Sequence, residues 1–140
     1  MKLLTKELED RFLEVGSQDE VEDPIVVCNF FNPVGSATWF ITEIASYRVE
    51  MDGDYLELEV GEWQEVKGRN LDARLVDVIL FGFASLFGPP HDELGYVSLR
   101  ELESVRLPLN LGIERDIYWI ERPLSQAKKE LPYEEHRETG

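Results

Sequence analysis

The sequence predicts an α+β fold, in which a mostly antiparallel sheet of about five or six strands carries an N-terminal helix and a short capped helix. Three stretches support this prediction. Asp52-Gly53 lies between two segments that favour strands, which is the strongest short signal for a hairpin. Residues 75–87 are the most apolar part of the chain and are rich in β-branched and aromatic residues. Ser98 and Glu101 have the spacing of a capping box at the start of a helix.

The first element is a helix over residues 6–15. Thr5 is placed to cap its N-terminus and Gly16 to end it. The helix has one apolar face that we expect to dock on the sheet, formed by Leu8, Phe12 and Val15. Residues 17–23 are acidic and are expected to form a solvated linker.

Two hairpins are predicted next. The first joins strands over residues 25–31 and 36–44 through the turn 32–35, which has proline and glycine at the positions that a type I turn favours. The second joins residues 47–51 and 54–60. The polar segment 61–72 is expected to loop out without regular structure.

The second half of the chain begins with a central strand over residues 75–87, where Gly82 indicates a bulge or a close backbone approach. The capped helix follows Ser98 and ends before Pro108. We expect residues 117–119 to be extended, residues 126–131 to form a short helix, and the rest of the tail to fray. The prediction is therefore one domain over residues 1–125 followed by a short helix and flexible tail over 126–140.

The charge of the chain restricts its partners. The 140 residues include 29 Asp and Glu but only 14 Lys and Arg, which gives a net charge of −15. Such a surface repels phosphates, so we expect no direct binding to nucleic acid and none to an anionic membrane. It favours a protein partner with a basic surface, although acidity that serves only solubility is the plainer interpretation of the charge alone.

The compartment is predicted to be the cytoplasm. Cys28 is the only cysteine, so no internal disulfide can form, and its apolar surroundings indicate an inert buried thiol. The first 15 residues have the pattern of a charged amphipathic helix and not of a secretory signal. The longest apolar run, 78–87, is about half as long as a membrane span.

No familiar catalytic or cofactor motif is present. The chain has no glycine-rich phosphate loop, nucleophile elbow, H-E-x-x-H sequence or paired C-x-x-C. His91 and His136 lie far apart in the sequence, and the turn at His91 offers too few ligands for a metal. We therefore expect no cofactor and no metal, and a protein that is not an enzyme.

A charged cluster is the main candidate for chemistry. Arg106 and Arg115 lie near several acids in the sequence. With Glu43, Glu93 and Tyr118 they have the composition of a small polar cleft. Such a cleft would grip a carboxylate or a phosphate, or act in a hydrolase. A structural network of salt bridges explains the same residues, and their spacing does not choose between the two.

Aromatic residues on the predicted strands are candidates for a binding surface. Trp39, Tyr96 and Tyr118 would form an exposed patch suited to protein contact if they shared the outer face of the sheet. Packing in the core is the alternative. Together with the charged cluster, these aromatics complete the set of candidate binding residues.

Several stretches, taken in order over residues 3–125, resemble one family. They are LLTKEL, DPIV, FFNPVGSATWFITE, LFGF, ELGYVSLRELESVRLPLNLGIERDIYW and RPLS. This pattern resembles domain of unknown function 2958, a family of small proteins carried by plasmids, integrative elements and phages. The chain departs from it at Leu107, where members typically have glycine, at an insertion over about 57–74, and in the tail beyond Ser125.

The resemblance implies a mobile-element setting and no established reaction. Accessory proteins in that setting often counter host defences, and acidic ones commonly occupy nucleic-acid channels. The sequence therefore predicts a non-enzymatic, acidic accessory protein that binds a protein partner, in its sharpest form as an inhibitor of restriction or CRISPR. The alternatives are a small-ligand-binding protein or hydrolase that uses the carboxylate/arginine cleft, and a structural module that forms homo-oligomers.

Overall fold

The computed structural model describes residues 2–69, 72–86, 88 and 91–131, and has the predicted α+β fold. Its helices are α1 (Lys6–Val15), α2 (Val60–Gly68), α3 (Leu99–Ser104) and α4 (Leu124–Lys128). Its strands are β1 (Ile25–Val26), β2 (Cys28–Phe31), β3 (Thr38–Met51), β4 (Asp54–Leu58), β5 (Ala73–Ser85), β6 (Glu93–Ser98), β7 (Glu114–Arg115) and β8 (Arg122–Pro123). A single 3₁₀ turn covers Pro108–Asn110.

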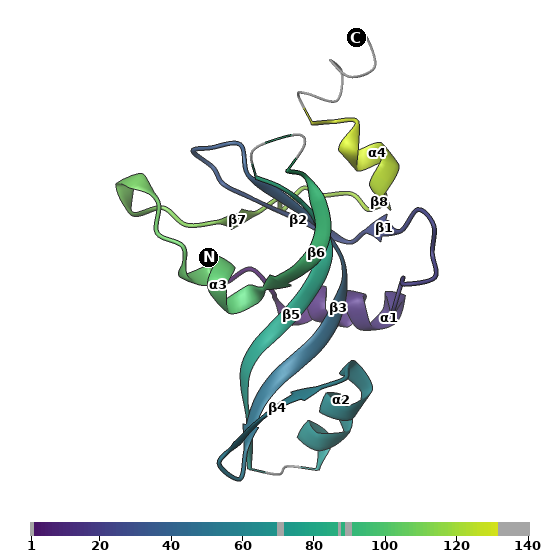
Figure 1. Ribbon diagram of the computed structural model, residues 1–140, viewed down its shortest axis with the longest axis vertical. Coiled ribbons are helices and arrows are strands. Elements are labelled where there is room, and N and C mark those ends of the chain that lie inside the picture. Colours follow the sequence, from purple (N-terminus) through teal and green to yellow (C-terminus); the bar gives the residue numbers. More distant parts are fainter. Residues whose placement is uncertain (1, 70–71, 87, 89–90, 132–140) are drawn as a thin grey trace.

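The main sheet is antiparallel and has six strands among the described residues. Its order is β6-β5-β3-β2-β7, with β4 paired to the far end of β3, while β1 and β8 form a separate two-stranded ribbon. Figure 1 shows β3 and β5 running along most of the molecule, with β4 and α2 at one end and α4 near the other. The two long strands are therefore the frame on which the other elements pack.

The strand β3 is longer than predicted. The sequence predicts separate strands over 36–44 and 47–51, but the structure has one strand of 14 residues. The pairing of β3 with β5 shifts register at three places, so the strand bends instead of ending. One shift lies beside Gly82, where an added Cβ would be 2.1 Å from the carbonyl oxygen of Phe40. The predicted close backbone approach at Gly82 is confirmed.

The opposite faces of the sheet pack into two hydrophobic clusters. The larger one includes Phe12 of α1, Leu99 and Leu102 of α3, and Trp63 of α2. Leu8 and Val15 pack against it, so the predicted docking of α1 on the sheet is confirmed. The smaller cluster joins Phe40 and Phe83 to α4 through Leu124, Ala127 and Leu131. Different helices thus cover different regions of the sheet, and no single helix covers all of it.

Residues 61–72 do not loop out as predicted, because most of them form helix α2. Glu59 and Glu62 make a reciprocal capping box at its start. Trp63 is only 7% exposed, and its ring centroid lies 5.9 Å from that of Tyr47 on β3. Most other residues of α2 are polar or glycine, so the helix has almost no apolar stripe that a sequence pattern could detect. Trp63 is its buried side chain and, with the partly buried Val60 and Val66, packs it against the core.

The prediction that residues 117–119 are extended is also wrong. β7 ends at Arg115, and the chain then turns, since the Trp119 amide donates to the carbonyl oxygen of Asp116 at 3.2 Å. The Asp116 carboxylate accepts the amide of Tyr118 at 2.9 Å. A short polar side chain that bonds the backbone two residues ahead competes with strand formation, and this outweighs the strand propensity of the aromatic pair.

The acidic linker is partly ordered by a buried amide. Gln18 is 7% exposed, and its side-chain amide donates to the carbonyl oxygens of Ile25 and Thr42. Its side-chain oxygen accepts the amide of Ile25. The expectation of a fully solvated linker is therefore wrong at this residue. The predicted strand 25–31 also divides into β1 and β2. The predicted tail after 131 lies outside the described residues.

None of the helices in the described part of the chain has both the length and the apolar character needed to cross a membrane.

Candidate functional site

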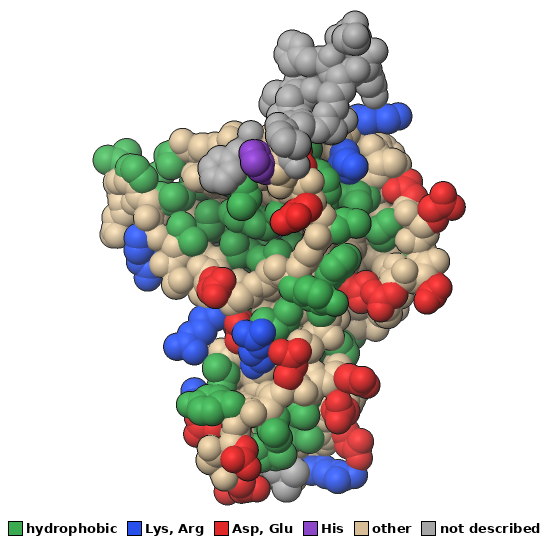
Figure 2. All heavy atoms as spheres, viewed as in Figure 1, with side chains coloured by type: hydrophobic (Ala, Val, Ile, Leu, Met, Phe, Trp, Pro, Cys, Tyr) green, Lys and Arg blue, Asp and Glu red, His purple; other side chains and the backbone are tan. Residues whose placement is uncertain are grey.

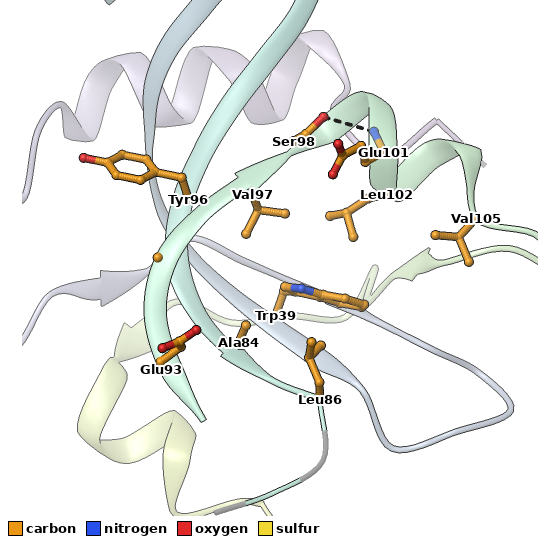
Figure 3. Close-up of a pocket in the computed structure, with 11 residues that line it drawn as sticks. Trp39, Ala84, Leu86, Glu93, Tyr96, Val97, Ser98, Glu101, Leu102 and Val105 are labelled. Carbon is orange, nitrogen blue, oxygen red and sulfur yellow. Dashed lines mark hydrogen bonds between the residues drawn. The ribbon is translucent and has the colours of Figure 1, made fainter. Parts of the chain in front are cut away.

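A groove lies between the edge strand β6 and helix α3. Its volume is about 380 Å³. Its walls are mostly apolar and come from four elements: Trp39 of β3, Ala84 of β5, Gly95 and Val97 of β6, and Leu102 of α3, with Val105 just after that helix. Figure 3 shows the indole ring of Trp39 between the α3 side chains and Leu86. Two of the predicted binding residues, Trp39 and Glu93, line this groove, while Tyr96 borders it and directs its side chain away (Figure 3).

Strand register explains why these residues meet. Trp39 pairs with Ala84, which in turn pairs with Glu93, so all three lie in one row on one face of the sheet. The next row is Ile41, Gly82 and Gly95. Two adjacent strands thus present glycine in the same row. Of the two, Gly95 lines the groove, and no side chain rises from it into that space.

The two glycines differ in what surrounds them. A Cβ at Gly82 would overlap the β3 backbone, so glycine is required there for the strands to pair. A Cβ at Gly95 would have no atom within 4 Å. The space over Gly95 is therefore open, and the fold does not require glycine at this position.

Helix α3 is fixed to the sheet by Asp77 of β5. The Ser98 hydroxyl accepts the amide of Glu101 at 3.1 Å, which confirms the predicted N-cap. The same hydroxyl donates to the Asp77 carboxylate at 2.5 Å, and that carboxylate also accepts the Arg100 amide at 2.9 Å. Two side chains therefore satisfy amides of the first turn of α3, and together they set the position of the groove wall.

Acidic side chains border the groove. Glu93 and Glu101 line it, and neither pairs with any of the described Lys or Arg residues. Figure 2 shows apolar side chains gathered in the area between α3 and β6, with acidic side chains beside it. The groove thus combines an apolar floor with negative charge at its margin, a combination that attracts a cationic group attached to an apolar one.

Tyr96 belongs to the other face of β6. Its side chain is 75% exposed and its ring lies edge-on to that of Phe81, with centroids 5.2 Å apart. Figure 3 shows it pointing away from the groove. Tyr118 is also exposed, in the turn after β7 at the opposite side of the sheet. The predicted aromatic residues do not form one patch, since Trp39 and Tyr96 lie on opposite faces and Tyr118 lies beyond the far edge strand.

The predicted carboxylate/arginine cluster is divided. Arg106 donates to the carbonyl oxygens of Glu103 and Val105 and lines a separate cavity of about 340 Å³. Arg115 donates to the Thr5 hydroxyl at the start of α1, at 3.3 Å. These arginines therefore point to different elements, and neither lines the groove that contains Glu93.

Glu43 lies in a third place, at a cavity of about 420 Å³ beside α1 and the start of α2. It is 7% exposed and accepts the Gln18 amide at 3.1 Å. Burial raises the pKa of the Glu43 carboxyl above its ordinary value, and the nearby Asp19 carboxylate raises it further. The nearby polar side chains of Thr42 and Gln18 also have hydrogen-bond partners. Its position is that of a buried structural carboxyl in the β3 bend.

The structure adds groove residues that the sequence analysis did not select. Gly95, Leu102 and Val105 define the groove, and Asp77 positions it. Leu102 and Val105 are three residues apart, a spacing typical of the apolar face of a helix that packs in the core. Asp77 is distant from Ser98 in the sequence, and only the folded structure, in which Ser98 pairs with Ile79 and bonds to the Asp77 carboxylate, brings the two together.

Other chemical features are limited. Cys28 is buried, and burial raises the pKa of its thiol well above the usual range, which keeps it protonated and unreactive. Among the residues that the structure describes, no group of three or more His, Cys, Asp or Glu side chains is placed to hold a metal ion.

A protein-family model matches residues 3–62 and 69–130 of the chain. Its description is "Protein of unknown function (DUF2958)". The chain belongs to this family. The DUF2958 match includes the elements from α1 to α4 except most of α2, because residues 63–68 of that helix lie between its two parts. No curated protein and no solved structure matches the chain.

Proposed function

We propose that this DUF2958 protein is a non-enzymatic accessory protein of a mobile element or phage, acting in the cytoplasm by binding a protein partner with a basic surface. Its sharpest form is an inhibitor of a defence nuclease, for example in restriction or CRISPR, that covers a nucleic-acid-binding surface. The observation that carries the proposal is an acidic exterior around the apolar groove between β6 and α3.

The charge distribution supports this proposal. Six of the thirteen described Lys and Arg residues pair with carboxylates of the same chain, as in the pairs Arg11–Glu121, Arg48–Glu57 and Arg74–Glu50, and acids outnumber cations by 29 to 14 in the whole sequence. The excess acids therefore face outward without local compensation, and Figure 2 shows them along the lower lobe and one flank of the visible face. A negative field of this kind steers a basic partner and rejects nucleic acid.

The resemblance implies a mobile-element setting, and this setting is the reason for proposing an inhibitor of a host defence. The alternative of a small-ligand site or hydrolase gains nothing from the geometry, because Glu43, Glu93, Arg106 and Arg115 do not line a common cavity. Formation of homo-oligomers is the other alternative, and the sedimentation experiment proposed below tests it.

The test is inhibition of DNA cleavage by purified restriction and CRISPR nucleases, measured with the full chain at increasing salt. We expect inhibition of at least one enzyme, no mobility shift of the DNA by the chain alone, and weaker inhibition as salt screens the charges. Absence of binding to any of them, or binding that salt does not change, would overturn charge-based occupation of a basic surface.

A further inference from the structure

We propose that β6 and the groove beside it accept an extended basic segment of the partner protein, which adds as a further strand to the sheet and places an apolar side chain over Gly95. This inference rests on the proposed function, since it assumes a protein partner, and it adds the mode of recognition.

The first observation is the open edge. β6 is the last strand of the sheet order and pairs with β5 alone among the described strands. The outer N–H and C=O groups of an edge strand form a template for another strand. Exposed Leu94 and Tyr96 lie on the same strand, on the face away from the groove. An exposed edge strand carries a risk of unwanted pairing with other chains. The presence of such an edge here therefore favours its use in docking.

The second observation is the shape beside that edge. Glu93, Gly95 and Val97 alternate on the groove face, and the middle one has no side chain. A large apolar side chain on an added strand can therefore lean across Gly95 toward the indole of Trp39. Leu102 and Val105 bound the same space from the α3 side. Pockets for alternate side chains are what give specificity to strand addition.

The third observation is charge, and it selects the occupant. Glu93 faces the groove from β6, and Glu101 does so from α3. An added strand with Lys or Arg two residues from its apolar anchor brings each cation beside a carboxylate, and opposite charges on adjacent strands stabilise the pair. A second copy of this chain would instead bring its own acids against them, because the net charge is −15. The geometry therefore points to a basic-apolar-basic segment with alternating spacing.

The test uses the isotopically labelled full chain and the probe peptide acetyl-TKTFTRT-amide, followed by NMR. We expect shifts confined to β6, to the Leu102 and Val105 amides, and to the Trp39 indole N–H. A peptide with the same side chains but N-methylated internal amides keeps its charge and cannot pair as a strand. It should bind at least about tenfold more weakly.

Two variants separate the groove from general electrostatics. Gly95→Val puts its Cβ where no atom lies within 4 Å, so we expect it to fold and to lose at least about tenfold in peptide affinity; its thermal unfolding is compared with that of the unmodified chain. Glu93→Lys with Glu101→Lys should also weaken binding. Its matched control is Glu20→Lys with Glu22→Lys, which changes the net charge equally in the exposed loop after α1 and should bind as the unmodified chain does.

Each other outcome has a definite meaning. Diffuse shifts that persist in Gly95→Val and with the N-methylated peptide would overturn the groove and leave the acidic surface as the binding feature. No shifts with millimolar basic peptide would overturn the groove, while nuclease inhibition would still test the proposed function independently. A concentration-dependent dimer in sedimentation, lost in Gly95→Val, would assign the edge to a second copy and overturn the basic partner.

Discussion

The carboxylate of Asp77 on β5 accepts the hydroxyl proton of Ser98 at 2.5 Å, and this contact fixes the helix that forms one wall of the groove. Ser98 directly precedes α3 in the chain and caps the helix. Asp77 contacts Ser98 from a neighbouring strand and also accepts the Arg100 amide. The cap is thus shared by two residues, of which only one is local in sequence.

We expect Asp77→Ala to lower the free energy of unfolding by about 1–3 kcal/mol, because it leaves the Arg100 amide and the Ser98 hydroxyl without their acceptor. Urea unfolding of the full chain measures this, and hydrogen exchange should show faster exchange of the Arg100 amide. The control is Asp72→Ala at an exposed position. Equal stability of the two variants would contradict the shared cap.

Gly82→Ala should lower the free energy of unfolding by at least about 2 kcal/mol, since the added methyl overlaps the carbonyl oxygen of Phe40 and must push the central strands apart. Gly95→Ala is the matched control in the next strand of the same row. It should leave stability equal or slightly higher, because its methyl meets open space and alanine restricts the unfolded chain. Thermal unfolding of both variants checks the pair; similar losses in both would refute the register described for this row.

Trp63→Ala should lower the free energy of unfolding by about 3–5 kcal/mol, as expected for removal of a buried aromatic side chain. Its control is Tyr118→Ala, which removes an aromatic group that is 85% exposed and should change stability by no more than about 0.5 kcal/mol. Chemical unfolding followed by circular dichroism distinguishes them. A small effect at Trp63 would mean that α2 is dispensable, as a looped-out insertion would be.

Glu43→Gln should stabilise the protein at neutral pH. Burial raises the pKa of Glu43 in the folded state, so folding favours the protonated carboxyl. Its favourable contribution is complete below the ordinary glutamate pKa, at about pH 4, and is lost as the pH rises through the raised value. Glutamine keeps an oxygen that can accept the Gln18 amide and carries no charge.

The advantage of Glu43→Gln over the unmodified chain should therefore be greatest near neutral pH and should shrink as the solution becomes acidic. Urea unfolding over a pH series measures it. The exposed Glu20→Gln is the control and should show no such trend. An advantage for Glu43→Gln that grows on acidification would reverse the assigned sign.

The sequence by itself determined the elements whose signals are local. Thr5 and Gly16 bound α1 where the capping rules place them, Asp52-Gly53 makes the hairpin, and Ser98 starts α3. Each of these depends on residues within four positions of one another, so the chain carries the whole signal. The α+β class follows from the same patterns, because the apolar run of β5 needs strands and helices on both sides to bury it.

Only the tertiary structure decided how those elements combine. The three register shifts of β3 against β5 join two predicted strands and set which residues face each other across the sheet. The β3–β5 and β5–β6 registers together place Gly82 beside Gly95 and Trp39 in the row of Glu93. The fold also separates Glu43, Arg106 and Arg115, which the sequence had grouped. Cross-strand neighbours are distant in the chain and a shift of one residue reverses the face of every side chain. For this reason no local pattern in the sequence could specify the groove.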